Sequence, residues 1–323
     1  MKTGKIQNRK GLMTIYFKKR TWFRIIFIPL IVILGNASLS QTHQHQLGKH
    51  IEFVQIKSKA LTGNRIGDSP NREMAVLLPP GYFKEISRRY PVVYLLHGLG
   101  PRKDGHLLML SCLVDMFNFM RMKELPEIIL IAIDGSTSFG GSYFSNSPTI
   151  GNFEQYVAVE VVNNIDGRFR TIARREGRAL AGFSMGGYGA IKLAMKYNNI
   201  FCQLGSLSGS PLSIRYRRTI YRNAINLHKK PLTMKQLIEE VTYEKNWNLA
   251  AAYAKASAFS PDTAKPPFFL LLPFESPNRE DDDPVWQLWW DDDPLGLVAK
   301  YARNLRNLEF IYIDQGDDET TFS

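Results

Sequence analysis

Short runs of consecutive apolar residues recur along the chain and alternate with longer segments of helical periodicity. The runs are Val92–Leu96, Ile128–Ile133, Ala179–Phe183, Leu204–Leu207, Pro267–Pro273 and Leu308–Ile313. Continuous runs rich in valine and isoleucine are typical of parallel strands that helices cover on both faces. Two further segments, Ile51–Ala60 and Glu73–Leu78, alternate as half-buried strands do. The order of strands and helices therefore predicts an α/β fold with a doubly wound, mostly parallel sheet.

Between these runs, three segments have a helical pattern. Asn152 is a good N-cap with Gln155 three residues later, and it precedes an apolar stripe made of Phe153, Tyr156, Val157 and Val161. Leu295–Leu305 predicts another helix. The segment Pro211–Ala258 is basic and then helical, and we interpret it as an insertion over the sheet edge.

The first 40 residues have the order of a secretory signal. Basic residues precede an apolar run from Ile25 to Gly35, and small residues follow it up to Ser40. We expect cleavage after Ser40, a linker over 41–50, one α/β domain over 51–323, and a secreted or periplasmic product. The apolar run is short for a bilayer span, so we expect no stable membrane span after processing, although an uncleaved anchor stays an alternative.

Charge and cysteine content narrow the function further. The net charge is +11, but residues 1–40 hold eight basic and no acidic residues, which leaves 33 basic and 30 acidic residues in the remainder. A domain with nearly balanced charge gives no support for a nucleic-acid partner.

The two cysteines, Cys112 and Cys202, lie in apolar contexts. We therefore expect buried thiols, with one disulfide as the alternative.

The candidate chemistry centres on Ser184. Gly182-Phe183-Ser184-Met185-Gly186 follows an apolar strand and starts a helix, which is the context of the G-x-S-x-G nucleophile elbow. Glycines suit this turn because strand and helix converge at it. The helix N-terminus directs free N–H groups and a positive dipole towards a developing oxyanion, so we expect the backbone of Met185 to be one oxyanion donor.

The second oxyanion donor is expected upstream. The strand Val92–Leu96 leads into His97-Gly98-Leu99-Gly100, and in hydrolases of this architecture the loop after such a strand supplies the other N–H group. We assign it to Leu99. We therefore interpret His97 as a structural residue of this loop.

These motifs together resemble the family of α/β-hydrolase esterases that includes S-formylglutathione hydrolases (esterase D), feruloyl and acetyl xylan esterases, and mycolyltransferases. The matching segments cover about residues 51–319 and are Leu78–Tyr82, Leu96–Gly100, Asp134 with Asn146-Ser147, Gly182–Ala190, Ser206–Gly209 and Asn304–Gly316. The resemblance implies a Ser-acid-His triad and hydrolysis of a carboxylic ester, without a cofactor or a metal. It implies Asp318 as the acid, or Glu319 if the spacing is ungapped.

The family's histidine follows the acid after one more helix and strand, whereas this sequence ends at Ser323. We therefore expect that this chain lacks the matching base and the C-terminal part of the fold. The only histidine after Ser184 is His228, which precedes the acid and is an alternative base, because triads are defined by geometry and not by order.

The secretory signal over the first 40 residues favours a small-molecule or polysaccharide-linked ester as substrate. We expect a carbohydrate-linked acyl or feruloyl-type ester. The alternatives are an acyltransferase of the same fold and a catalytically inactive binding protein. The roles of two further clusters stay open. For the tryptophans we favour packing over a substrate subsite, and for the Asp triplets we favour a solvated run over a Ca²⁺ site. These clusters are Trp286, Trp289 and Trp290, and Asp281–Asp283 and Asp291–Asp293.

Overall fold

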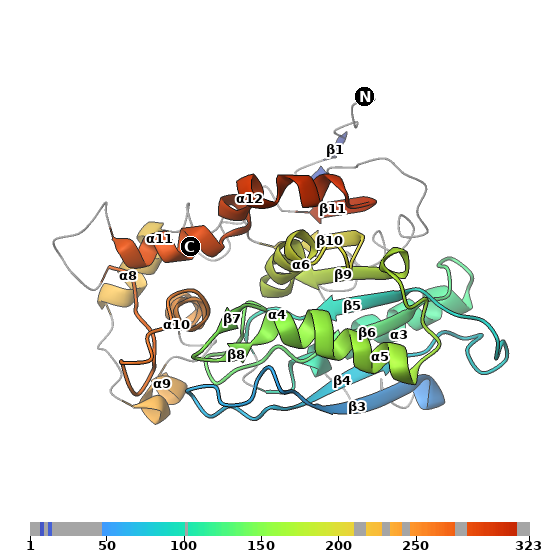
Figure 1. The fold of residues 1–323 in the computed structure, drawn as a ribbon, viewed down its shortest axis with the longest axis horizontal. Coiled ribbons are helices and arrows are strands. Elements are labelled where there is room, and N and C mark those ends of the chain that lie inside the picture. The colour runs from blue at the N-terminus through green and yellow to red at the C-terminus, as the bar shows by residue number, and fades with distance from the viewer. Residues whose placement is uncertain are drawn as a thin grey trace.

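The structure is a computed structural model that describes residues 7–9, 12–14, 47–100, 103–209, 218–227, 233–240, 246–274 and 283–314. Its centre is a seven-stranded sheet with the order β11-β10-β9-β5-β6-β4-β3 (Figure 1). The strands are β3 (Ile51–Lys57), β4 (Asn71–Leu77), β5 (Val92–Leu96), β6 (Ile129–Ile133), β9 (Arg178–Phe183), β10 (Gln203–Leu207) and β11 (Phe310–Asp314). Two small antiparallel pairs are β1 (Gln7–Arg9) with β2 (Leu12–Thr14) and β7 (Asn146–Ser147) with β8 (Gly151–Asn152).

The five strands β6, β5, β9, β10 and β11 run parallel, while β4 runs antiparallel to both β6 and β3. This confirms the expected α/β fold with a mostly parallel sheet. Helices fill the connections, because parallel neighbours need a crossover. They are α3 (Leu110–Arg121), α4 (Phe153–Gln155), the π-helical η4 (Tyr156–Val161), α5 (Val162–Arg168), α6 (Met185–Lys196), α8 (Arg218–Leu227), α9 (Met234–Glu240), α10 (Trp247–Phe259), α11 (Pro284–Asp292) and α12 (Pro294–Arg306). The 3-10 turns are η2 (Gly48–His50), η3 (Gly105–Met109) and η5 (Arg175–Gly177).

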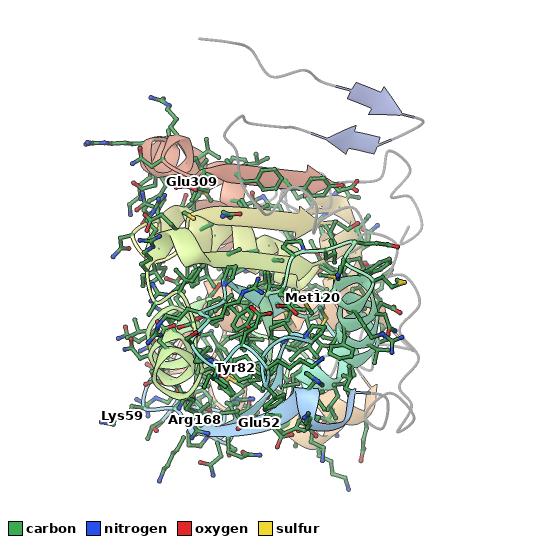
Figure 2. The ribbon with its side chains drawn as sticks, turned by 90° about the vertical axis from the view of Figure 1, so that its right-hand side faces the viewer. Glu52, Lys59, Tyr82, Met120, Arg168 and Glu309 are labelled. Carbon is green, nitrogen blue, oxygen red and sulfur yellow. The ribbon has the colours of Figure 1, made fainter. Side chains whose placement is uncertain are left out.

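The apolar runs are continuous because the sheet has a core on each face. In β5 the residues Val92, Tyr94 and Leu96 belong to one buried cluster, and Val93 and Leu95 belong to the other. In Figure 2, Arg168 at the end of α5 lies on one side of the view and Met120 of α3 on the other. The prediction of strands covered on both faces is therefore confirmed.

The start of the helix after β8 differs in one detail from the expectation. The stripe residues Phe153, Tyr156, Val157 and Val161 are all fully buried, as predicted. Asn152 stands at the N-cap, but its side chain makes no capping hydrogen bond. Asn146 provides the cap, because its Oδ1 accepts the Glu154 N–H at 3.0 Å. The first strand of the small hairpin, and not the residue next to the helix, thus completes this helix end.

Two other expectations were wrong. The segment Pro267–Pro273 forms turns and a single bridge between Pro261 and Leu270, not a strand. Its prolines lack the N–H groups that a sheet ladder needs. The helices of the predicted insertion do not lie over an edge strand. They lie beyond the carboxyl ends of the parallel strands (Figure 1), where Ser147 Oγ donates to Ser257 O of α10 at 2.6 Å.

The strand register places several loops along one edge of the sheet. One row of paired residues crosses the strands through Met74, Ile133, Leu96, Gly182, Ser206 and Ile313. Just beyond this row, at the carboxyl ends of the parallel strands, the chain continues into Asp134, His97 and Ser184. Ligands of open α/β sheets bind at this edge.

Candidate active site

Ser184 occupies a strained turn between β9 and α6. Its backbone has φ 53° and ψ −118°, in the region that residues with a side chain rarely adopt. Its N–H donates to Leu207 O at 2.9 Å, and its carbonyl accepts the Tyr188 N–H at 3.0 Å, so neighbours on both sides hold the turn. The hydroxyl forms no capping hydrogen bond with its own helix. The side chain is half-buried and leaves the end of the strand at the ligand edge.

The glycines of the motif are required by close backbone contacts. A Cβ on Gly182 would lie 2.3 Å from the carbonyl of Gly186, and a Cβ on Gly186 would lie 1.9 Å from Leu96 O. A Cβ on Gly187 would lie 2.7 Å from the Cα of Gly209, so the segment Ser206–Gly209 packs directly on the first turn of α6. These contacts confirm that strand and helix converge at the turn.

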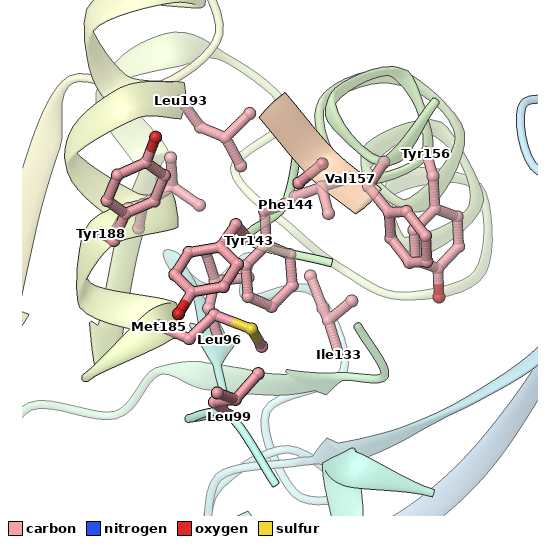
Figure 3. Packing of buried hydrophobic residues seen from close by; sticks show 14 of the residues in the cluster. Leu96, Leu99, Ile133, Tyr143, Phe144, Tyr156, Val157, Met185, Tyr188 and Leu193 are labelled. Carbon is pink, nitrogen blue, oxygen red and sulfur yellow. The ribbon is translucent and has the colours of Figure 1, made fainter. Parts of the chain in front are cut away.

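The loop after β5 lies beside the serine. A Cβ on Gly98 would lie 3.5 Å from the Cβ of Ser184, in ordinary contact. The side chains of Leu99 and Met185 come together, because a Cβ on Gly141 would touch both of them, and Figure 3 shows the two residues next to each other. Neither the Leu99 N–H nor the Met185 N–H donates to an acceptor in the described part of the chain.

His97 is a buried, bonded residue of this loop. It is fully buried, its Nδ1 lies 2.7 Å from Gly98 O, and its Nε2 accepts the Gly135 N–H at 2.9 Å. Accepting at Nε2 requires the neutral ring with its proton on Nδ1. Burial lowers the pKa of His97, which keeps this ring neutral. The contacts agree with the structural role expected for His97.

A buried ion pair supports the same loops. Arg72 Nη1 lies 3.1 Å from Asp134 Oδ2, and Asp134 Oδ1 accepts the N–H groups of Gly105 at 3.0 Å and Ser136 at 3.1 Å. Burial opposes ionisation of Asp134, but the Arg72 cation and the hydrogen bonds from Ser136 outweigh it and hold the pKa of Asp134 below its ordinary value. The ionised carboxylate thereby fixes the loop after β5 and the loop after β6 against each other.

The predicted acid and the alternative base lie outside the described residues: Asp318, Glu319 and His228 all belong to segments that the structure leaves undescribed. Of the described histidines, His97 and His106 are buried, and His106 Nε2 lies 3.2 Å from Glu73 Oε1. His50 precedes β3, whose first residue pairs with the far end of β4, so it lies at the opposite edge of the sheet from Ser184.

Sequence reasoning missed a buried charge network around α6, the helix that follows Ser184. Lys192 of α6 is 1% exposed, and its Nζ lies 2.5 Å from Asp292 Oδ2, 2.7 Å from Ser145 Oγ and 3.3 Å from Glu154 Oε1. Lys196 adds a second cation at 2.5 Å from Glu154. Lys192 stands in the otherwise apolar stretch Ala190–Met195 of the helix, and this was the available signal.

The expectation of a solvated acidic run was wrong for most described members. Asp292 pairs with Lys192, and Asp293 is fully buried and caps α12 by accepting the Leu295 N–H at 2.9 Å. Asp283 caps α11 through the Val285 N–H at 2.8 Å. Asp291 is exposed, as predicted, while Asp281 and Asp282 lie outside the described residues.

Packing is confirmed for two of the three tryptophans. Trp289 is fully buried, and its Nε1 donates to Ser260 Oγ at 2.9 Å. The ring centroid of Trp286 lies 5.7 Å from that of Trp289 and 5.1 Å from that of Phe274, and both pairs are tilted. Trp289 also packs edge-on against Tyr221 of α8 and Phe259 of α10.

The remaining expectations concern thiols, metals and membranes. Cys112 and Cys202 are buried free thiols, and burial raises their pKa values to about 12 and about 11. Among the described residues, no group of three or more acidic, histidine or cysteine side chains is arranged to hold a metal ion. None of the helices in the described ranges has the length and hydropathy needed to cross a bilayer.

Comparison with known proteins agrees with this geometry. The family model described as "Putative esterase" matches residues 68–323. Esterase Rv1288 of Mycobacterium tuberculosis is 38% identical over 152 residues, which are 45% of this chain and 30% of that protein. An endo-1,4-beta-xylanase/feruloyl esterase of Xylanibacter ruminicola is 31% identical over 137 residues, which are 42% of this chain and 19% of that protein. The chain thus spans less than a third of the length of these relatives.

Among solved structures, a CE1 ferulic acid esterase of Anaeromyces mucronatus is similar over 48% of this chain and 56% of that chain. The sequence identity is 24% and the TM-score is 0.39.

Proposed function

Because the chain belongs to the esterase family of α/β-hydrolases whose model matches residues 68–323, we propose that it hydrolyses carboxylic esters with Ser184 as the nucleophile. The observation that carries the proposal is the strained backbone of Ser184 at the junction of β9 and α6. Strain of this kind persists where the surrounding structure holds it, and it clusters at functional sites. Here it presents a hydroxyl at the ligand edge of the sheet.

In the first step Ser184 Oγ attacks the ester carbonyl, and a base takes the hydroxyl proton. The tetrahedral oxyanion is stabilised by the N–H groups of Leu99 and Met185, which have no acceptor in the described part of the chain. Collapse of the intermediate breaks the ester C–O bond, and the base returns the proton to the leaving alcohol. Water then attacks the acyl-serine by the same route and releases the carboxylic acid.

The acid that orients the base is proposed to be Asp318, with Glu319 as the alternative. The base is expected to be a histidine, and the described histidines do not fit this role: His97 and His106 are buried and bonded, and His50 lies at the other edge. His228 is therefore the residue to test within this chain.

The substrate is proposed to be a carbohydrate-linked acyl or feruloyl-type ester that the protein meets after export. Two findings support this: one relative is named an endo-1,4-beta-xylanase/feruloyl esterase, and the first 40 residues have the order of a secretory signal.

The test is hydrolysis of methyl ferulate and p-nitrophenyl acetate by the wild-type chain and by Ser184→Ala. We expect the substitution to lower the rate roughly 10⁴-fold or more, as loss of a triad nucleophile does. Ser208→Ala is the matched control, because Ser208 follows the neighbouring strand β10 with a similar φ of 46°. An alkyl fluorophosphonate should also modify Ser184, as detected by peptide mass spectrometry.

Undiminished hydrolysis in Ser184→Ala, or a phosphonate adduct on another residue, would place the nucleophile elsewhere. His228→Ala is assayed beside it. Loss of turnover in that variant with unchanged folding assigns the base to His228, and retained turnover assigns the base to another residue.

A further inference from the structure

A polar cavity of about 360 Å³ lies on the same edge of the sheet as Ser184, beside the loops that surround it. It is bounded by the start of β4, by Gln55 of β3, by the loop after β5 and by the loop after β6. The residues that shape its chemistry are Asp68, Arg72, Glu73, Lys103, Asp104 and Asp134. Lys103 and Asp104 follow Leu99 by four and five positions in the sequence, so the cavity lining and the residue beside Ser184 are close in the chain.

Part of the cavity wall is fixed by internal bonds. Asp134 is held by Arg72 and by the Gly105 N–H. Asp68 accepts the Ser138 N–H at 2.9 Å and the Ser138 hydroxyl. These carboxylates are already paired, which gives the cavity a rigid outline before any ligand enters.

Other lining groups keep hydrogen-bonding capacity. The side chains of Lys103 and Asp104 form no hydrogen bond or ion pair with any residue that the structure describes. Arg72 uses Nη1 for Asp134 and Ser136, and its Nε and Nη2 are buried. The exposed side chains of Lys103 and Asp104 are therefore the groups that can bind a ligand in the cavity.

The mixture of charges selects the class of ligand. Four carboxylates face two cations, so the lining disfavours an anion. The described acidic and histidine groups are not arranged to hold a metal ion. A neutral polyhydroxylated molecule fits best, because each hydroxyl can donate to a carboxylate and accept from a lysine or arginine.

We propose that this cavity is a binding subsite for a neutral saccharide, and that it holds the sugar portion of the ester substrate. Strands β5 and β6 separate β9 from β4, so at about 4.8 Å per strand the cavity lies roughly 14 Å from the strand of Ser184. An oligosaccharide that carries its acyl group at one end spans this separation. The link to the ester depends on the proposed function, whereas saccharide binding itself does not.

The test separates the two by measuring, with the wild-type chain, both ester turnover and the binding of saccharides that carry no ester. Calorimetric titration with xylotriose, a neutral trisaccharide, is compared with titration with glucuronate. The variants are Asp104→Asn and Lys103→Met. Asparagine tolerates the left-handed φ of 58° at position 104, so the loop should keep its shape. Lys84→Met is the control, because Lys84 is exposed and follows the opposite end of β4.

We expect xylotriose to bind and each cavity variant to weaken it about tenfold, as the loss of a hydrogen bond to a charged group does. Lys84→Met should leave the affinity unchanged. The proposal is overturned if xylotriose does not bind, if glucuronate binds as tightly, or if the cavity variants bind as the parent does. Saccharide binding together with an absence of ester turnover would retain the subsite and reject the proposed reaction.

Discussion

The turn around Ser184 and the acidic run Asp291–Asp293 are both short, unusual pieces of sequence, but only the first revealed its structure in advance. Close backbone contacts within and beside the turn leave no room for a Cβ at Gly182 or Gly186. In the acidic run, the central residue Asp292 pairs with Lys192, which lies 100 residues earlier in the chain.

The difference shows which constraints a sequence carries locally. A turn that only glycine can form is visible as a glycine, because the backbone conformation and the residue type belong to the same position. A buried charge looks like a solvated one in sequence, since its burial depends on a distant partner that offsets the cost of desolvation. Four predictions test this distinction.

The largest effect is expected from Gly186→Ala. Its new Cβ would meet Leu96 O at 1.9 Å, so the strand or the helix must move. We expect a loss of about 4 kcal/mol or more in the free energy of unfolding, measured by urea denaturation. Gly98→Ala is the matched control, because its nearest contact is an ordinary 3.4 Å. Equal stability of the two variants would show that this turn is not set by backbone contact.

Lys192→Met should destabilise the protein by about 3 kcal/mol in the same measurement, because it removes the buried cation of Asp292 and leaves Glu154 with Lys196 alone. Asp292→Asn should cost less, about 1–2 kcal/mol, since Asp292 is 26% exposed and Lys192 keeps Glu154. The reverse order would mean that the network is not centred on Lys192.

Asp293→Asn should change the pH dependence of stability. Burial raises the pKa of Asp293 to about 7 from an ordinary 3.8, so between these values the folded state holds a proton that the unfolded state has released. Stability contributed by this group is present at low pH and is lost as pH rises towards 7, by up to about 1.4 kcal/mol per pH unit.

Asparagine is also a good N-cap, so the variant should keep α12 and lose this slope, which lies between the ordinary pKa of 3.8 and the folded value of about 7. His97, whose lowered pKa gives the opposite slope up to its ordinary 6.5, is common to both proteins and cancels in the difference. Thermal unfolding across this pH range checks the result, and parallel curves for the two proteins would contradict it.

The smallest effect concerns single caps. Asp283→Ala should cost about 1 kcal/mol, because Asp283 Oδ1 accepts the Val285 N–H at 2.8 Å at the start of α11. Asp291→Ala should cost close to nothing, since Asp291 is exposed and bonds only to Gln287 one turn away. Thermal unfolding of both variants compares the capping Asp283 with the exposed Asp291 directly. An equal loss of stability would argue against the cap.

Most of the sheet could be predicted from the sequence. β5 matches its apolar run residue for residue, and β6, β9, β10 and β11 match theirs to within two residues at either end, because a strand covered on both faces must be apolar throughout. The prediction of a strand at Pro267–Pro273 was wrong. Apolar residues are present there, but the prolines lack the N–H donors that would join the segment to a sheet.

The sequence by itself determined that Ser184 stands in a glycine-lined turn between a buried strand and a helix, since each requirement there is met by the residue at that position. Only the tertiary structure decided which loops share the edge with it. The register from Gly182 through Leu96 and Ile133 to Met74 brings Asp134, Arg72 and the polar cavity to the side of the sheet that Ser184 faces. Strand order and register arise from packing between distant segments, and a single position in the sequence carries no record of them.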